Sequence, residues 1–218
     1  MDFSSRLLLT PLFQGFSRLD FLDIVGKTAL DFRTYPDRAE LCRQGDECRA
    51  ICMLLGGEVV CEAESPEHSY VLSERVRAPY TFPFETLYGL HNRHGRTVRA
   101  SGEAQAVLLD KACVTELLAL YPVFQMNFHN LLSTQAQQFS SFLWRRRGEE
   151  IEERFRSFLQ RRCLRPVGDK TLRVHMEVLA GELGATRLRV SSMLAALAAR
   201  GVLQYGRGKI HIPALELL

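Results

Sequence analysis

The chain has 218 residues, 46% of them hydrophobic and 24% charged, which is the composition of a soluble globular protein with one large domain or two small ones. No apolar run reaches the ~18–20 residues of a membrane span. The N-terminal stretch lacks the basic start and long apolar segment of a secretory signal. We therefore expect a cytoplasmic protein without a membrane partner.

The charge is distributed unevenly along the chain. Residues 1–144 hold 13 Lys and Arg against 17 Asp and Glu, a net charge of −4, whereas residues 145–218 hold 15 against 8, a net charge of +7. A basic C-terminal part favours an anionic partner for that part alone. Chance clustering of solvated surface charge is the alternative.

The first half of the chain changes from helical to strand-like patterns. Residues 7–30 show short helical patterns, and from Tyr35 to about Leu109 short apolar or alternating runs are separated by turn signals. This spacing predicts a β-sandwich or β-roll, followed by a short helix from Lys111 to Leu120. Among the turn signals are Gln44–Asp46, Leu55–Glu58, Glu64–Glu67, His94–Arg96 and Ser101–Gly102. In the helical part we expect five residues in the core: Leu19, Phe21, Leu22, Ile24 and Val25.

A long helix is predicted from Pro122 to about Arg147, because proline is tolerated in a first helical turn and apolar residues recur near helical spacing. At ~1.5 Å per residue it would span roughly 38 Å, which is long for a small domain. We expect the apolar stripe to pair with a second copy of the chain, although packing on its own domain is the alternative. The expected interface residues are Phe124, Phe128, Leu131, Leu132, Phe139 and Phe142. Arg145–Gly148 breaks the pattern and is read as a hinge.

The C-terminal part reads as a winged helix-turn-helix. A helix from Glu149 to about Arg162 precedes a short strand around Leu172–Val174. Two helices follow, Met176–Leu183 and Arg187 to about Arg200. Two strands, Val202–Tyr205 and Lys209–Ile212, flank a Gly-Arg-Gly turn. Two helices at a tight turn, followed by a hairpin, are typical of this DNA-binding motif.

The turn between the two helices has the residues that such a motif needs. Gly184 suits the left-handed position that ends a helix, and the Thr186 hydroxyl can cap the next helix. At 100° per residue, small residues and Leu188 face outward, and two arginines flank them, so this face can enter a major groove. The candidate DNA-binding residues are Thr186, Arg187, Leu188, Arg189, Ser191 and Ser192 on the helix, with Arg207 and Lys209 on the hairpin.

The chain resembles the Crp/Fnr family of bacterial transcription regulators over nearly its whole length. The resemblance rests on Tyr35–Asp46, Gly57–Val60, Val98–Ala100 followed by Glu103, and Leu183–Arg187 followed by Val190 and Leu194. It implies an α+β protein in three parts. These are an effector-sensing, cyclic-nucleotide-binding-like β-roll (1–121), a dimerisation helix with hinge (122–147), and a winged helix-turn-helix (148–218). The implied partners are a palindromic double-stranded DNA site, a second copy of the chain as homodimer, and RNA polymerase.

Departures from the family pattern bear on the ligand and on the operator. Cyclic-nucleotide binders of the family carry Gly-Glu-Leu and then Arg-Ser, whereas this chain has Phe84-Glu85-Thr86 and only Arg96-Thr97 as a shifted stand-in for the pair. Phe139 replaces a small polar residue on the dimer helix. We therefore expect no tight binding of cyclic AMP. The candidate effector pocket is Phe84, Glu85, Thr86, Arg96, Thr97 and Phe139. Of three family base-reading positions only Arg187 matches, so the operator should differ from the cyclic-AMP type.

Other ligands and other functions are also open at this stage. No cysteine precedes Cys42, so the family's N-terminal iron–sulfur ligands are absent, and Cys42, Cys48, Cys52 and Cys61 are best read as buried free thiols. Haem is a possible cofactor through one of four histidines: His68, His91, His94 or His129. The alternative function is a ligand-, haem- or redox-sensing module that acts through protein contacts, with vestigial DNA binding. No enzyme motif stands out.

Overall fold

The computed structural model describes residues 3–28, 30–82, 84–144 and 148–218. The chain divides into two compact units that are each described by themselves: residues 1–59 with 76–143, and residues 60–75 with 144–218. The expected hinge at 145–147 lies outside the described residues. Among the helices that the structure describes, none is long and apolar enough to cross a membrane.

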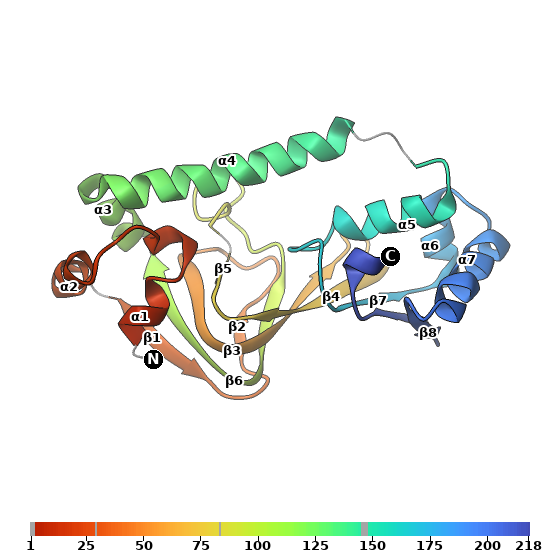
Figure 1. Cartoon of the computed structure of the whole chain (residues 1–218), viewed down its shortest axis with the longest axis horizontal. Helices are drawn as coiled ribbons and strands as arrows, with labels where there is room; N and C mark the ends of the chain where they lie inside the picture. The colour runs from red at the N-terminus through yellow and green to blue at the C-terminus, as the bar shows by residue number, and fades with distance from the viewer. Residues whose placement is uncertain (1–2, 29, 83, 145–147) are drawn as a thin grey trace. The chain divides into compact units, whose positions relative to one another are not determined.

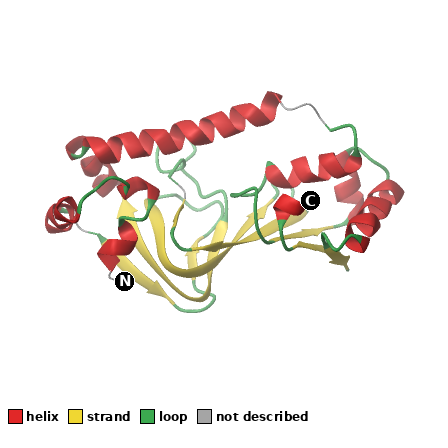
Figure 2. Cartoon of the chain, in the orientation of Figure 1, coloured by secondary structure: helices red, strands yellow, loops and turns green. Residues whose placement is uncertain are grey.

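The first unit is built on antiparallel strands that form the expected β-roll (Figure 2). Its strands are β1 (Asp31–Tyr35), β2 (Glu40–Cys42), β3 (Ala50–Glu64), β4 (Tyr70–Arg77), β5 (Tyr80–Phe82) and β6 (Thr97–Asp110). β6 pairs with β1 and β2, and β3 pairs with β5. Residues 60–64 of β3 and 70–75 of β4, which is most of β4, belong to the second unit.

Two of the sequence's turn signals lie inside strands. Gly57 and Gly102 were expected to separate strands, but β3 and β6 run through them with φ of +82° and +79°. A Cβ on Gly57 would meet the carbonyl oxygen of Glu103 at 2.3 Å, so only glycine fits there. Gly57 thus marks a close backbone approach inside a strand, whereas at Gly102 only the positive φ favours glycine, since a Cβ there would meet nothing within 4 Å.

Helices precede and follow the strands of the first unit (Figure 1). They are α1 (Phe3–Leu7), a 3₁₀ turn (Pro11–Phe13), α2 (Arg18–Lys27), α3 (Lys111–Leu120) and α4 (Pro122–Trp144). Ser17 and Asp20 form a capping box that starts α2, and the Asp110 carboxylate caps α3. The core under these helices includes Phe13, Ile51, Met53, Leu117 and Phe124.

The expected core face of α2 is only partly correct. Phe21 and Ile24 are buried, but Leu19, Leu22 and Val25 are 78%, 65% and 41% exposed. Positions 21 and 24 are one helical turn apart and share the face toward the core, while the other three residues share a different face of the same helix. Counting apolar residues over a short helix did not reveal which face would be covered.

The second unit confirms the winged helix-turn-helix. It contains α5 (Ile151–Gln160), β7 (Lys170–Val174), α6 (Met176–Leu183), α7 (Arg187–Ala199), β8 (Gln204–Gly206) and β9 (Lys209–Ile212). Its sheet has the strand order β4-β7-β9-β8, all antiparallel. One apolar cluster joins the helices to this sheet, with Phe155, Leu172, Leu194 and Ile212 fully buried.

Candidate nucleic-acid interface

The turn between α6 and α7 has the local geometry that its sequence predicts. Gly184 ends α6 in the left-handed conformation, with φ of 59°. The Thr186 hydroxyl accepts a hydrogen bond from the Arg189 amide at 3.3 Å, which satisfies one of the unpaired donors at the start of α7. Glycine and threonine therefore set where one helix stops and the next begins.

α7 separates a buried face from an exposed one. Val190, Met193, Leu194 and Leu197 are buried in the unit's core. The candidate DNA-contacting positions are arranged on the opposite side, where Arg187, Leu188, Arg189 and Ser192 are exposed and Ser191 is half-buried. Leu188 is 77% exposed, so an apolar side chain lies on this outer face. We call α7 the recognition helix from here on.

Ion pairs tie the recognition helix to its neighbours. Arg187 Nη1 lies 2.9 Å from Glu177 Oε1 on α6. At the other end, Arg200 Nη1 donates to both carboxylate oxygens of Glu152 on α5, at 3.0 and 2.9 Å. The first pair is one that the sequence reading missed, because it considered Arg187 only as a ligand for DNA.

Arg154 on α5 forms hydrogen bonds to the backbone of the turn between α6 and α7. Its guanidinium donates to the carbonyl oxygens of Leu183 and Gly184, both at 3.4 Å, and to that of Gly148 at 2.8 Å. A cation at the carbonyl end of α6 also interacts favourably with the helix dipole. Arg154 thus fixes the place where α6 turns into the recognition helix.

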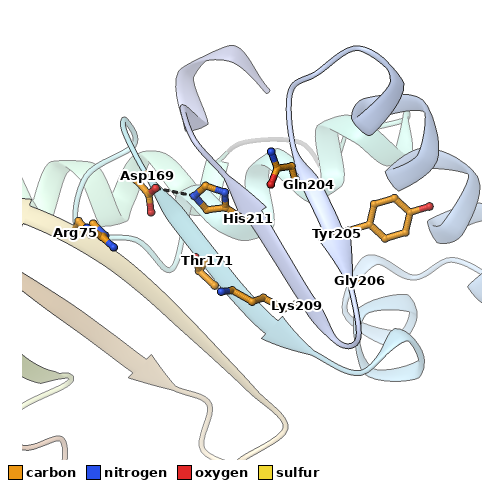
Figure 3. A pocket seen from close by; sticks show the side chains of 8 residues that line it. All are labelled: Arg75, Asp169, Thr171, Gln204, Tyr205, Gly206, Lys209 and His211. Carbon is orange, nitrogen blue, oxygen red and sulfur yellow. Dashed lines mark hydrogen bonds and ion pairs between the residues drawn. The ribbon is translucent and has the colours of Figure 1, made fainter.

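The wing is the β8–β9 hairpin. Arg207 at its turn has φ of 49°, and both Arg207 and Lys209 are exposed. A hollow of about 420 Å³ lies on the sheet beside the wing, and Figure 3 shows its lining. The lining residues are Arg75, Asp169, Thr171, Gln204, Tyr205, Gly206, Lys209 and His211. His211 Nε2 and the Asp169 carboxylate lie 2.7 Å apart. Lys209 and Arg75 make this hollow a polar surface with two permanent cations.

In the first unit, the candidate effector residues differ in their surroundings. Phe84 and Thr86 are half-buried, Glu85 is exposed, and Phe139 on α4 is 60% exposed. The Thr97 hydroxyl accepts a hydrogen bond from the Gln44 amide at 3.1 Å, so it already holds the turn before β3. Arg96 is half-buried, and its carbonyl oxygen lies 3.7 Å from the Cys42 thiol.

Two residues that the sequence reading did not assign to the pocket belong beside Glu85. Burial is the main reason that the pKa of Cys48 is raised, and the negative charge of Glu85 adds to it; the same charge also acts on the pKa of His94, in the opposite direction to burial. Burial is the larger effect on His94 and lowers its pKa overall. The buried Nδ1 of His94 has no hydrogen-bond partner among the described residues. His94 and Cys48 are thus within electrostatic range of Glu85 in the β-roll.

The apolar stripe on α4 divides into two parts. Phe124 and Phe128 are 0% and 4% exposed in the core of their own unit, where Phe124 packs edge-on against Phe13. Because these two side chains are buried in their own unit, the prediction that they contact a partner helix is wrong. Leu131 and Leu132 are half-buried, and Phe139 is exposed. The side chain of Phe142 lies outside the described residues.

The cysteines are all free thiols, and most of them are buried. Burial raises the pKa of Cys42 and of Cys52 to about 12, so both stay protonated at neutral pH. His68 is exposed and lies 2.9 Å from Glu64, whereas His91 and His129 are simply exposed. Among the described residues, no group of three or more His, Cys, Asp or Glu could hold a metal ion.

Comparisons with known proteins agree with this fold. The Crp-like helix-turn-helix domain family matches residues 153–218. The catabolite activator protein of Thermus thermophilus is 21% identical, with 95% of each chain covered and a TM-score of 0.53. A putative Crp/Fnr regulator of Eubacterium rectale is 16% identical, with 95% of this chain and 96% of the other covered, at 0.53.

A third similar solved structure is that of a ligand-responsive regulator. The c-di-GMP-responsive regulator CLP of Xanthomonas campestris is 16% identical, with 88% of this chain and 97% of the other covered and a TM-score of 0.52. At such identities the likeness establishes the fold. No curated protein sequence matches the chain.

Proposed function

We propose that the chain is a dimeric, sequence-specific DNA-binding transcription regulator of the Crp/Fnr type, in line with the Crp-like helix-turn-helix domain that matches residues 153–218. The observation that carries the proposal is the recognition helix. It is capped by Thr186, it buries one face in its own unit, and it exposes Leu188 and Ser192 between flanking arginines. Such a face complements the major groove, where arginine pairs with guanine and an apolar side chain contacts a thymine methyl.

The positive charge of the same part of the chain supports phosphate contacts. Residues 145–218 carry a net charge of +7, and Arg207 and Lys209 are exposed on the wing. Phosphate contacts release counterions, so the affinity for DNA should fall steeply as salt rises. In the proposed dimer two recognition helices bind half-sites about 34 Å apart on one face of the duplex.

The proposed division of labour follows the family. Residues 1–121 sense an effector, residues 122–147 dimerise and carry the hinge, and residues 148–218 read DNA. The exposed Phe139 supports pairing between copies through the second half of α4. As a DNA-reading regulator, the protein would act in the cytoplasm and contact RNA polymerase.

The effector is proposed to be something other than cyclic AMP. Phe84 brings a bulky ring where cyclic-nucleotide binders need glycine, and Thr97 already accepts a backbone hydrogen bond. Thermal unfolding with sub-millimolar cyclic AMP should show no shift of several degrees. The same assay should include c-di-GMP, because the similar Xanthomonas protein responds to it.

The experiment that tests the DNA-reading function is selection of random duplexes by the purified, ligand-free protein. Enrichment of a two-fold palindrome is the expected result, and it should be lost with the Arg187→Ala variant. The matched control is Arg18→Ala, which removes an exposed arginine from α2. Salt-sensitive, sequence-independent binding alone, with every candidate ligand, would mean that the protein does not read DNA. That result would favour the alternative function as a sensor that acts through protein contacts.

A further inference from the structure

The tip of the β3–β4 hairpin belongs to the DNA-binding unit, although its strands continue from the β-roll. Residues 60–75 form one compact unit with residues 144–218. β4 pairs antiparallel with β7 over five residue pairs, from Tyr70 opposite Val174 to Glu74 opposite Lys170. β4 is therefore a strand of the same sheet as the wing, and it covers an edge of β7 that would otherwise be open.

A fully buried ion pair lies at one end of this pairing. Lys170 Nζ is 3.2 Å from Glu74 Oε2, and both side chains have 0% exposure. Glu74 also accepts a hydrogen bond from the Leu164 amide at 2.6 Å. Lys170 donates to the Val167 carbonyl at 2.8 Å. The two charges are thus paired and also bonded to the loop that leads from α5 into β7.

A second set of contacts holds the other end. The Tyr70 hydroxyl accepts from Arg162 Nε at 2.6 Å, and its ring lies edge-on to Phe158 with centroids 5.3 Å apart. Arg162 in turn bonds Glu182 on α6 at 2.8 Å. Between the two ends, Leu72 is fully buried in the apolar cluster that the recognition helix shares.

We propose that Glu74 and Lys170 form a latch that keeps the hairpin permanently on the DNA-binding unit, and that Glu74 is a positioning residue for DNA reading. Opening the latch would leave two buried charges unpaired and expose Leu72, so this joint is far more costly to separate than a surface contact. The hairpin then moves with the recognition helix as one body.

The latch gives the β-roll a connection to the DNA-binding unit besides the chain after α4. β3 passes from one unit to the other just after Gly57, whose left-handed backbone interrupts the regular strand. A change in the β-roll would reach β7 through these two strands and then the recognition helix through their common core. This inference rests on the proposed DNA-reading function.

The test begins with full-length Glu74→Gln, which keeps the shape of the side chain and leaves Lys170 buried without a counter-charge. We expect the affinity for the selected palindrome to fall by about tenfold or more. The matched control is Glu58→Gln, which breaks the Arg77–Glu58 pair of 2.7 Å between β3 and β4, outside the second unit. The control should bind DNA as the wild type does.

A covalent lock separates positioning from loss of folding. Ser73 and Thr171 are opposite each other in the β4–β7 register, so cysteines placed at both positions should form a disulfide under mild oxidation. In the Glu74→Gln protein, the oxidised disulfide should restore binding to the palindrome. Reduction of the disulfide should weaken the binding again. The single-cysteine variants control for reactions of the native thiols.

Each outcome decides the proposal. Normal DNA binding by Glu74→Gln would overturn it, as would failure of the disulfide to restore binding, or loss of binding when the disulfide is placed in the wild type.

If wild-type protein reads no DNA at all, the proposed function fails, and amide exchange then tests the latch alone. The amides of residues 170–174 should exchange slowly in the wild type and in Glu58→Gln, and fast in Glu74→Gln. Equal exchange in all three would overturn the latch.

Discussion

Arg187 Nη1 and Glu177 Oε1 lie 2.9 Å apart, so the first residue of the recognition helix is paired with an acidic residue in the first turn of α6. Both side chains are about two-thirds exposed, at 65% and 64%. An ion pair so open to solvent contributes little stability and can exchange its partner at small cost. In the free protein Arg187 is therefore held near its proposed DNA-contacting position by a pair that is easily exchanged.

Replacement of Arg187 tests its role as a base or phosphate ligand. Arg187→Ala should weaken binding to the selected palindrome by about 1–3 kcal/mol while barely changing the stability of the fold. Fluorescence anisotropy at several salt concentrations measures this, and a loss of roughly one unit in the salt slope would identify a phosphate contact. Unchanged affinity would remove Arg187 from the reading surface.

The partner of Arg187 allows a change in the opposite direction. Glu177→Gln removes a negative charge beside the DNA-facing surface and frees Arg187, so DNA binding should tighten by about two- to fivefold at low salt. The gain should shrink as salt rises, because the interaction is screened. The same titrations with Glu182→Gln, on the same helix but paired with Arg162, should show a smaller effect. Weaker binding by Glu177→Gln would mean that the pair orients Arg187 for DNA.

Arg154 should matter more for the DNA-binding unit than its neighbours on α5. Arg154→Met removes four hydrogen bonds to the carbonyl oxygens of Gly148, Glu149, Leu183 and Gly184. We expect a loss of about 2 kcal/mol in the free energy of unfolding, measured by urea denaturation. Arg156→Met, an exposed arginine of the same helix, is the control and should lie within about 0.5 kcal/mol of the wild type. Equal stabilities of the two variants would contradict a positioning role.

His94 should give the β-roll a pH dependence. Burial lowers its pKa from 6.5, so in the unfolded chain this histidine takes up a proton at a higher pH than in the folded protein. Its contribution to stability is therefore present above about pH 6.5 and lost as the pH falls through the lower folded value. His94→Gln should flatten this part of the thermal-unfolding curve against pH. His91→Gln, at an exposed site, should leave it unchanged.

The thiols of Cys42 and Cys52 should be inert. With pKa values of about 12, Cys42 and Cys52 carry almost no thiolate at pH 8, so neither should react with iodoacetamide in the folded protein. Mass spectrometry after timed labelling checks this, with protein in urea as the positive control. Rapid labelling of Cys42 in the native state would instead support a redox-sensing role.

The helix-turn-helix could be predicted from sequence because its signals are local. Gly184 and Thr186 each act within one turn of their own position, and helix α6 has the bounds that the pattern predicted. Gly57 misled the prediction, because a glycine that makes a tight turn and a glycine that passes close to Glu103 have the same sequence pattern. Only the fold distinguishes the two.

The pairings between distant segments could not be predicted in the same way. Nothing near Glu74 indicates Lys170, which is far along the chain, and an acidic residue in a strand is normally expected to face solvent. The Glu177–Arg187 pair was missed for a related reason, because helical spacing describes one helix and this pair joins two. Local periodicity therefore identified the elements but not their partners.

The second unit is made from two stretches of sequence, residues 60–75 and 144–218. A chimaera that joins the sensor of another regulator to residues 144–218 would leave the native β4 strand behind and expose β7. An exposed strand edge is a template for pairing with other chains, so such a fusion should aggregate or bind its own copies. Grafting works on this protein only if the hairpin tip is transplanted together with the C-terminal residues, as one discontinuous module.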